Sequence, residues 1–396
     1  MSAPRDGRRS WDVIIIGGRV AGASTALLLA RSGLRVLVIE RARRGSDTVS
    51  THALMRGGVL QLHRWGLLDR VAATGAPPIR RVTFHYGPNP MPVSLKPYAG
   101  VEALYGPRRT VLDALLVSAA EDAGAWFDFG LSMINIARDS TGRVAGVVVR
   151  DHLGSTWTER APLVVGADGR GSPVAHQVAA PTLLAGSHAA AYLYGYWPAK
   201  DVDGYHWFYG DGLSAGVIPT NDGLVCVFVA APAAVLAARM RHRQPLDAAR
   251  ELAARLDCPL ADLVADRPEG PVRFFRGMQA RLRQAYGPGW ALVGDAGWWK
   301  DPLSTYGISD AFRDAEVLAR AVVAGAASHD ALRTALCRYQ AERDRLALPM
   351  HPIVDRLASH QWDLAEAQQL LRGLSSVMAD DVEAILGFDS VPARTA

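Results

Sequence analysis

The sequence predicts an α/β protein in which a discontinuous, Rossmann-like nucleotide-binding domain surrounds an inserted antiparallel β-sheet domain and is followed by a helical C-terminal tail. Three observations predict this class. A strand–helix–strand unit with a glycine turn opens the chain, an alternating, aromatic-rich region occupies residues 188–230, and a strand–loop–helix pattern returns near residue 290. We therefore expect four segments: the nucleotide domain's first part at 1–180, the substrate-binding sheet at 181–285, the nucleotide domain's second part at 286–350, and the tail at 351–396.

The opening unit is read from "WDVIIIGG", "VAGASTALLLARSG" and "LRVLVIER", which predict a buried strand, a helix and a second strand. Gly17 and Gly22 stand at the first and third glycine positions of G-x-G-x-x-G, and Arg19 stands at the middle one. The helix beginning near Val20 directs its free N–H groups at this turn, where a diphosphate is stabilised. Glu40 ends the second strand, and a carboxylate there favours a ribose without a 2′-phosphate, as in FAD or NAD.

Arg19 leaves two interpretations open. A side chain crowds the place where the backbone approaches a diphosphate, and a left-handed backbone there would cost about 1–2 kcal/mol. Either Arg19 turns its side chain aside and adds charge-assisted hydrogen bonds to a bound dinucleotide, or the stretch is a glycine turn without a ligand. The intact unit and Glu40 favour binding.

The rest of the chain supplies the other elements. Residues 54–74 predict a broken helix, "RTVLDALLVSAAEDAGA" a helix with one apolar face, and 131–165 a set of strands. "IPTNDGLVCVFVA" predicts a hairpin turned by Asn221, Asp222 and Gly223, and helices follow between 233 and 256.

A second motif indicates which dinucleotide binds. In "ALVGDAGWWKDPLSTYGISDAFRDAEVLA", Asp295 follows a strand, Pro302 stiffens a loop, and a long helix starts at Gly307. The carboxylate of Asp295 can accept hydrogen bonds from a ribityl chain. The positive end of the helix can stabilise negative charge on a reduced flavin. The pattern therefore favours FAD.

With these motifs in place, the chain resembles the FAD-dependent oxidoreductases of the p-hydroxybenzoate hydroxylase fold, a superfamily of flavoprotein monooxygenases and geranylgeranyl reductase-like enzymes. It is most similar to a bacterial subgroup near the geranylgeranyl reductases. The segments that carry the resemblance are "GGRVAG" (17–22), "SDTVSTH" (46–52) and "GDAGWWKDPLSTYGISDAFRDAE" (294–316). An arginine at the middle glycine position is ordinary in that subgroup, whereas Val20 stands where the subgroup often has Cys.

The resemblance also implies site residues. Asp168 in "VVGADGRGS" matches an internal motif near the cofactor, and Arg109 matches an arginine that reaches the FAD pyrophosphate and ribityl region. The expected cofactor-binding set is Gly17, Arg19, Ala21, Gly22, Glu40, Arg41, Arg109, Asp168, Gly294, Asp295, Pro302, Gly307 and Ile308.

Candidates for catalysis are His52, Trp298 and Tyr306, which occupy the segments expected near the flavin ring. A packing role for His52 and for the tryptophans stays open. The substrate is expected to contact alternating aromatic side chains on one face of the sheet, with ordinary core packing as the alternative reading. The residues expected to bind substrate are Tyr194, Tyr196, Trp207 and Trp299.

Composition excludes several classes of protein. A net charge of +4 without a long basic run argues against nucleic acid as a partner, and the three distant cysteines have no metal-ligand spacing, so we predict no metal site. The N-terminal apolar run is too short for a signal peptide, and no stretch approaches the roughly 18 apolar residues of a membrane span. The sequence therefore predicts a cytoplasmic protein whose oligomeric state is open.

The function expected first is an FAD-dependent monooxygenase acting on a small aromatic or polyketide-like secondary metabolite. NAD(P)H would reduce FAD transiently, since no second dinucleotide fingerprint is found, and O2 would react through a flavin C4a-hydroperoxide. The alternative is a reductase or dehydrogenase of a carbon–carbon double bond, as in geranylgeranyl reductases. A halogenase is disfavoured because W-x-W-x-I-P is missing from the sequence. A flavin-free binding protein is disfavoured by Glu40, Asp295 and Gly307.

Overall fold

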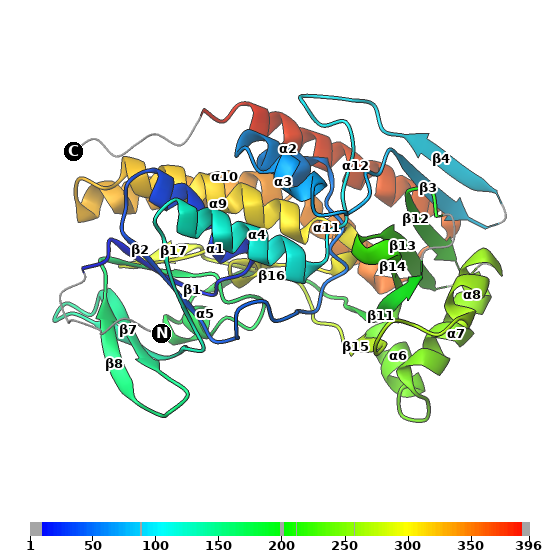
Figure 1. The fold of residues 1–396 in the computed structure, drawn as a ribbon, viewed down its shortest axis with the longest axis horizontal. Coiled ribbons are helices and arrows are strands. Elements are labelled where there is room, and N and C mark those ends of the chain that lie inside the picture. The colour runs from blue at the N-terminus through cyan, green and yellow to red at the C-terminus, as the bar shows by residue number, and fades with distance from the viewer. Residues whose placement is uncertain (1–9, 88, 199–201, 211, 257, 390–396) are drawn as a thin grey trace.

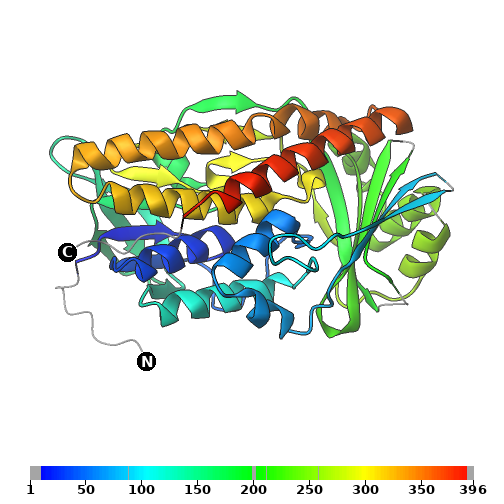
Figure 2. The same cartoon turned by 90° about the horizontal axis from the view of Figure 1, so that it is seen from above.

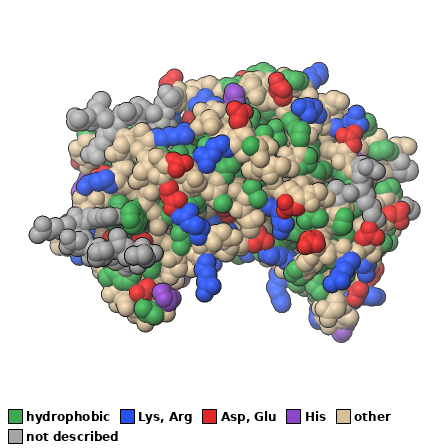
Figure 3. Space-filling view, viewed as in Figure 1, with side chains coloured by type: hydrophobic (Ala, Val, Ile, Leu, Met, Phe, Trp, Pro, Cys, Tyr) green, Lys and Arg blue, Asp and Glu red, His purple; other side chains and the backbone are tan. Residues whose placement is uncertain are grey.

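A computed structural model describes residues 10–87, 89–198, 202–210, 212–256 and 258–389. The molecule is elongated, with two lobes that lie side by side along its long axis (Figures 1 and 2). One lobe holds a mostly parallel sheet covered by long helices, and the other holds a mostly antiparallel sheet. On the face seen in Figure 3, acidic and basic side chains are interspersed, and the lower edge is hollowed between the two lobes.

The first lobe is built on a six-stranded sheet in the order β17-β18-β9-β1-β2-β5, parallel except for the edge pair β17/β18. Its central strands are buried on both faces because helices cover one side and a three-stranded sheet the other. Strands from before residue 167 and from residues 286–292, on either side of most of the second lobe, share this sheet, which confirms the discontinuous Rossmann-like domain. The strands are β1 (Val13–Ile16), β2 (Val36–Glu40), β5 (Trp126–Phe129), β9 (Leu163–Gly166), β17 (Tyr286–Gly287) and β18 (Trp290–Leu292).

The helices predicted from the opening unit, from "RTVLDALLVSAAEDAGA" and from Gly307 onward are present, whereas the sequence analysis did not predict α10. On one face lie α1 (Val20–Arg31), α4 (Arg109–Asp122), α9 (Gly307–Ala324) and α10 (His329–Ala347). The broken helix is confirmed as α2 (Arg56–Arg64) and α3 (Leu68–Ala72). The opposite face carries β6 (Ser132–Arg138), β7 (Val144–Arg150), β8 (Thr156–Arg160) and α5 (Pro173–Gln177).

The second lobe contains a seven-stranded sheet in the order β15-β11-β14-β13-β12-β3-β4. Its neighbours are antiparallel except β12 and β3, and the expected hairpin at Asn221–Gly223 joins β13 to β14. Two of its strands, β3 and β4, come from a segment for which the sequence predicts no strand. The bounds are β3 (Arg81–Tyr86), β4 (Pro90–Ser94), β11 (Ala190–Pro198), β12 (Tyr205–Gly210), β13 (Leu213–Pro219), β14 (Leu224–Pro232) and β15 (Arg273–Phe275).

The two faces of this sheet belong to different cores. Residues such as Trp197 and Phe208 pack against three short helices, α6 (Ala233–Arg239), α7 (Pro245–Leu256) and α8 (Cys258–Ala265). The alternate residues, including Tyr192 and Trp207, join the core of the first lobe. The alternation of side chains along each strand thus separates a helix-covered face from a face directed at the nucleotide-binding lobe.

The C-terminal tail is helical, as expected, and consists of α11 (Met350–Ser359) and α12 (Leu364–Leu386). Helix α12 packs against α2 and α11 and spans both lobes in Figure 2. A small sheet between the lobes contains β10 (Thr182–Ala185), β16 (Arg281–Arg283) and β19 (Trp298–Trp299). Within the described ranges, no helix is long and apolar enough to cross a membrane.

Candidate FAD-binding and active site

A cavity of about 680 Å³ lies where the segments singled out by the sequence analysis meet. The turn after β1 and the end of β2 form one part of its wall, and the loop from Trp299 into α9 forms another. Residues 48–53 and 167–171 line it between them, and side chains of β11 and β15 close it. One cavity therefore joins both pieces of the nucleotide domain to the sheet of the second lobe.

The glycine turn is shaped for close approach. Gly17 has φ +102°, and a Cβ there would lie 2.4 Å from the carbonyl oxygen of Ala167. A Cβ on Gly22 would lie 1.7 Å from the carbonyl oxygen of Gly17, so only glycine lets α1 pack against the turn. Gly17 and Ala21 line the cavity, while Gly22 lies behind them. The N-terminus of α1 consequently faces the cavity.

Arg19 occupies its position without backbone strain, because its φ of −93° and ψ of −162° are extended rather than left-handed. Its guanidinium donates to the carbonyl oxygens of Ser46 (3.1 Å) and Asp47 (3.2 Å) and to the carboxylate of Asp113 (3.2 Å). Arg109 binds the same carboxylate at 2.9 Å. Both guanidinium groups line the cavity beside the start of α1, where a diphosphate would find two cations and a helix N-terminus.

Glu40 is held in place by the backbone. Its carboxylate accepts hydrogen bonds from the N–H groups of Gly18 (2.7 Å) and Ala42 (2.8 Å) at the end of β2. An ionised carboxylate has about four acceptor sites, so two bonds leave capacity for ribose hydroxyls. Arg41, exposed beside it, also lines the cavity.

The second segment approaches the first through another glycine. Gly294 has φ +60°, and a Cβ there would lie 2.9 Å from that of Ala21. Asp295 follows and lines the cavity, and among the described residues no hydrogen bond reaches its carboxylate. Burial raises the pKa of Asp295, and the nearby cations Lys300, Arg109 and Arg170 oppose that rise. The carboxylate is therefore available to hydroxyl groups of a ligand.

Helix α9 begins beside this carboxylate. A Cβ on Gly307 would meet open space, and Pro302, Gly307 and Ile308 all line the cavity. The helix is 18 residues long, so its N-terminal dipole is fully developed. Two helix N-termini, two carboxylates with spare acceptors and a pair of guanidinium groups fit the diphosphate, hydroxyls and flavin ring of FAD.

Asp168 lines the cavity but is largely occupied by its own loop. It accepts hydrogen bonds from the Ser172 hydroxyl (2.6 Å) and the Val174 N–H (2.9 Å). Burial raises the pKa of Asp168, while these hydrogen bonds oppose the rise. Its main observed effect is to fix the loop 168–172 at the cavity wall.

Of the three residues expected to take part in catalysis, two line the cavity and one does not. His52, with φ +51°, lines the cavity, and its Nε2 lies 3.2 Å from the Tyr196 hydroxyl. Burial lowers the pKa of His52 to about 3, so its ring is neutral. Tyr306 lines the cavity while its hydroxyl donates to Asp381 of α12 at 2.7 Å. Trp298 is buried and is not among the lining residues.

Of the four residues expected to bind substrate, two line the cavity and two do not. Tyr194 and Trp299 line the cavity, whereas Tyr196 and Trp207 do not. Tyr196 lies under the guanidinium of Arg108 (4.5 Å from the ring centroid), and Trp207 packs on Phe228. Several lining residues were not selected as site residues from the sequence, although Tyr192 shares the alternation of Tyr194 and Lys300 follows the two tryptophans. Among them are Tyr192, Arg170, Phe275, Met278 and Lys300.

The sequence pattern of the family described as FAD binding domain matches residues 10–351. The chain belongs to this FAD-binding family. This flavin-dependent oxidoreductase is 31% identical over 376 residues to kynurenine 3-monooxygenase of Salinispora arenicola, covering 85% of this chain and 77% of that protein. It is 25% identical over 327 residues to digeranylgeranylglycerophospholipid reductase 1 of Methanococcoides burtonii, covering 81% of this chain and 76% of that protein.

Solved structures show the same fold. PqsL of Pseudomonas aeruginosa in complex with 2-aminobenzoylacetate superposes with a TM-score of 0.78 at 21% identity, covering 94% of this chain and 100% of that chain. The flavin-dependent brominase Bmp2 gives a TM-score of 0.76 at 17% identity, covering 96% and 100%. At these identities the likeness concerns the fold of this flavin-dependent oxidoreductase alone.

Proposed function

We propose that this protein is an FAD-dependent monooxygenase that uses NAD(P)H and O2 to hydroxylate or oxidise a small aromatic or polyketide-like molecule. One observation carries the proposal: a single cavity runs from both FAD-binding segments to the aromatic wall formed by β11 and β15. A substrate in that wall would lie next to the end of the cavity at which α9 begins.

FAD would be held by the residues already described. Arg19, Arg109 and the N-terminus of α1 would bind the diphosphate, Glu40 the ribose, and Asp295 the ribityl hydroxyls. Bound there, FAD supplies electron transfer and oxygen chemistry. The N-terminus of α9 supports that chemistry because it stabilises negative charge in this part of the cavity.

The protein's contribution toward a substrate is an aromatic wall. Tyr192, Tyr194, Phe275 and Trp299 present their rings to the cavity, and Phe275 and Trp299 meet edge to face at 5.9 Å. The Arg170 guanidinium stacks 4.9 Å from the Phe275 ring centroid at this wall. Inclined rings of this kind offer both faces and edges to an aromatic substrate and exclude water from the reacting atoms.

The test is substrate-dependent oxygen consumption. Purified protein loaded with FAD would be given NADH or NADPH and a panel of aromatic acids, phenols and polycyclic aromatic ketones, and NAD(P)H oxidation and O2 uptake would be followed together. We expect at least one compound to accelerate both and to gain one oxygen atom by mass spectrometry. Turnover of a substrate that continues at the same rate without oxygen would contradict the proposal.

A second candidate, reduction of a carbon–carbon double bond, is favoured by the similarity to digeranylgeranylglycerophospholipid reductase over 81% of the chain. A reductase needs no oxygen, so the two functions separate in an anaerobic experiment. If FAD reduced with dithionite is reoxidised by a polyprenyl substrate under argon, and the product gains two hydrogen atoms, the reductase is the correct assignment.

A further inference from the structure

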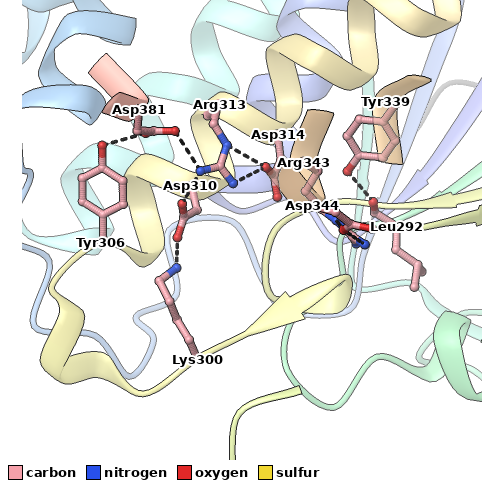
Figure 4. A network of polar contacts seen from close by, with 10 residues as sticks. All are labelled: Leu292, Lys300, Tyr306, Asp310, Arg313, Asp314, Tyr339, Arg343, Asp344 and Asp381. Atoms are coloured by element: carbon pink, nitrogen blue, oxygen red, sulfur yellow. Dashed lines mark hydrogen bonds and ion pairs between the residues drawn. The ribbon is translucent and has the colours of Figure 1, made fainter. Parts of the chain in front are cut away.

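Behind the wall of the cavity lies a buried cluster of charges, shown in Figure 4. Lys300, in the loop before α9, forms an ion pair with Asp310 in the first turn of α9. Arg313, one turn further on, binds Asp310 at 2.7 Å, Asp314 at 2.7 Å and, across the helix interface, Asp381 of α12 at 2.9 Å. Each of these side chains is at most 4% exposed.

The cluster has more carboxylates than cations. When all five groups are ionised, two cations face three carboxylates, so the cluster carries one net negative charge. Loss of the Lys300 proton would double that charge inside a dry environment. A new negative charge in the adjacent cavity would therefore raise the affinity of Lys300 for its proton.

The choice of lysine is informative. The chain contains 40 arginines and only three lysines, at positions 96, 200 and 300. An arginine keeps its proton at every pH a protein meets, whereas a buried lysine can lose it. At this position, where a permanent cation would also satisfy Asp310, the chain carries an amine that can change its charge.

Lys300 also lies where charge changes during the redox cycle. It lines the cavity together with Asp295, Pro302 and Gly307, which are the residues expected around the ribityl chain and flavin ring. A flavin that gains two electrons and one proton carries one additional negative charge. The amine lies 4.0 Å from the centroid of the Trp298 ring, which shields it from solvent on one side.

We propose that Lys300 takes up a second proton when FAD bound to this protein is reduced. In this proposal the amine of the oxidised protein is neutral above neutral pH, and its contact with Asp310 is then a hydrogen bond to the carboxylate rather than an ion pair. Reduction delivers two electrons and one proton to FAD, and one further proton moves from solvent to the Lys300 amine, giving an ammonium group paired with Asp310. Charge is then balanced inside the protein, and the ring keeps its negative charge for reaction. The inference rests on FAD binding and not on the identity of the substrate.

The direction of the effect follows from the groups around the amine. Burial and Arg313 lower the pKa of Lys300 to about 7, and the carboxylates oppose this shift. Reduction adds negative charge, which raises that pKa. Uptake of the second proton is therefore confined to a window that begins near pH 7 and ends at the higher pKa of the reduced protein. The charged groups that face Lys300 are Asp295, Asp310, Arg313, Asp314 and Asp381.

The experiment is a redox titration of the FAD-loaded protein with dithionite and a mediator dye, without substrate, at a series of pH values from about 6 to 10. The slope of the midpoint potential against pH gives the number of protons taken up per two electrons. Between about pH 7 and the pKa of Lys300 in the reduced protein, we expect two protons for the wild-type protein and one for Lys300→Met, which retains the volume of the side chain. Lys96→Met, at an exposed lysine, is the matched control and keeps two.

Two further variants keep the test decisive if Lys300→Met binds FAD poorly. Lys300→Arg carries a permanent charge and is expected to take up one proton, with a higher midpoint potential than the wild-type protein above pH 7. Asp310→Asn removes the partner of the ammonium group and is expected to move the two-proton window to lower pH. A slope of one proton in the wild-type protein, or of two in both Lys300 variants, would overturn the proposal.

These outcomes are independent of the monooxygenase assignment. Dithionite replaces NAD(P)H, and neither O2 nor a substrate is present. A protein that shows the lysine-dependent slope but consumes no oxygen with any substrate would retain this inference and lose the proposed function. A protein that oxidises a substrate with O2, but whose slope of midpoint potential against pH is the same in the wild-type protein and the Lys300 variants, would retain the proposed function and lose this inference.

Discussion

At the scale of single residues, the cavity combines charges that are fixed by protein partners with one carboxylate that is not. Arg19 and Arg109 share Asp113, and Glu40 is bound by two backbone N–H groups. Asp295 has no such hydrogen bond among the described residues. The Asp295 carboxylate is half-buried and opens onto the cavity, so it can accept a hydrogen bond from a ligand hydroxyl, and such a bond to a charged group strengthens binding.

Asp295→Asn is therefore expected to weaken FAD binding, because it removes the charge of the acceptor that is free to bind hydroxyl groups of the ligand. Hydrogen bonds to a charged acceptor contribute about 1.5–3 kcal/mol, or about 10- to 150-fold in affinity. Titration of the apoprotein with FAD, followed by quenching of flavin fluorescence, measures the change. Asp139→Asn in an exposed turn is the control and should leave the affinity unaltered. Equal affinities of the two variants would remove Asp295 from the site.

The two glycines that follow strand and helix in the first unit allow a matched comparison. Gly17 and Gly33 both have positive φ, +102° and +82°, but only a Cβ on Gly17 meets another atom, the carbonyl oxygen of Ala167. Gly33→Ala should lower the free energy of unfolding by about 1–2 kcal/mol, the cost of a left-handed backbone alone. Gly17→Ala should lower it by about 1–3 kcal/mol more because of the overlap. Urea denaturation of both variants checks this, and identical midpoints would contradict it.

The site could be predicted from the sequence to the extent that local pattern determines it. The turn at Gly17, the end of β2 at Glu40 and the start of α9 at Gly307 are local, and the cofactor residues expected from them line the cavity or lie directly behind it. Alternation along β11 and β12 correctly predicted which face of the sheet carries the aromatic side chains. It did not predict which of these side chains reach the cavity. Tyr196 and Trp207 are covered by Arg108 and Phe228, contacts that depend on packing distant in sequence.

At the scale of elements, the sequence predicted neither the strands β3 and β4 nor the contacts that the C-terminal tail makes. The prolines of β4 hide its alternation, and β3 pairs in parallel with β12, more than 100 residues away, so neither strand is predicted by local signals. Helix α12 supplies none of the lining residues of the cavity. It instead holds α9, because Asp381 binds Arg313 and accepts a hydrogen bond from Tyr306, the residue before the first turn of α9.

Asp381→Asn tests this contact between helices. Asparagine weakens the buried hydrogen bonds that Asp381 accepts from Arg313 and Tyr306, while Asp310 and Asp314 still balance the charge of Arg313. Hydrogen bonds to charged groups contribute about 1.5–3 kcal/mol. We expect the free energy of unfolding in urea to fall by that amount and FAD binding to weaken with it. Asp380→Asn, the exposed neighbour on the same helix, should change stability by less than about 0.5 kcal/mol. Equal stability of both variants would show that α12 does not hold α9 through this carboxylate.

At the scale of the whole molecule, the tail is also attached to the sheet of the second lobe through a buried histidine. His360 joins α11 to α12 with φ +52°, and its Nε2 lies 3.0 Å from the Ser214 hydroxyl of β13. Burial lowers the pKa of His360 to about 4, from an ordinary value of 6.5. As the pH falls, His360 therefore becomes protonated near pH 6.5 in the unfolded chain but only near pH 4 in the folded protein. Stability contributed by the neutral ring is complete above pH 6.5 and is lost as the pH falls toward 4.

His360→Asn isolates this contribution, since asparagine tolerates a left-handed backbone. The variant is expected to be less stable than the wild-type protein at pH 7, and the gap should narrow by about 1.4 kcal/mol per pH unit between about pH 6 and pH 4. Comparing two proteins cancels the other buried groups that titrate in this range, such as Asp301, whose pKa burial raises to about 6 and whose effect has the opposite sign. A difference in free energy of unfolding between His360→Asn and the wild-type protein that does not change with pH would contradict this prediction. It would mean that the contact between tail and sheet tolerates a protonated His360.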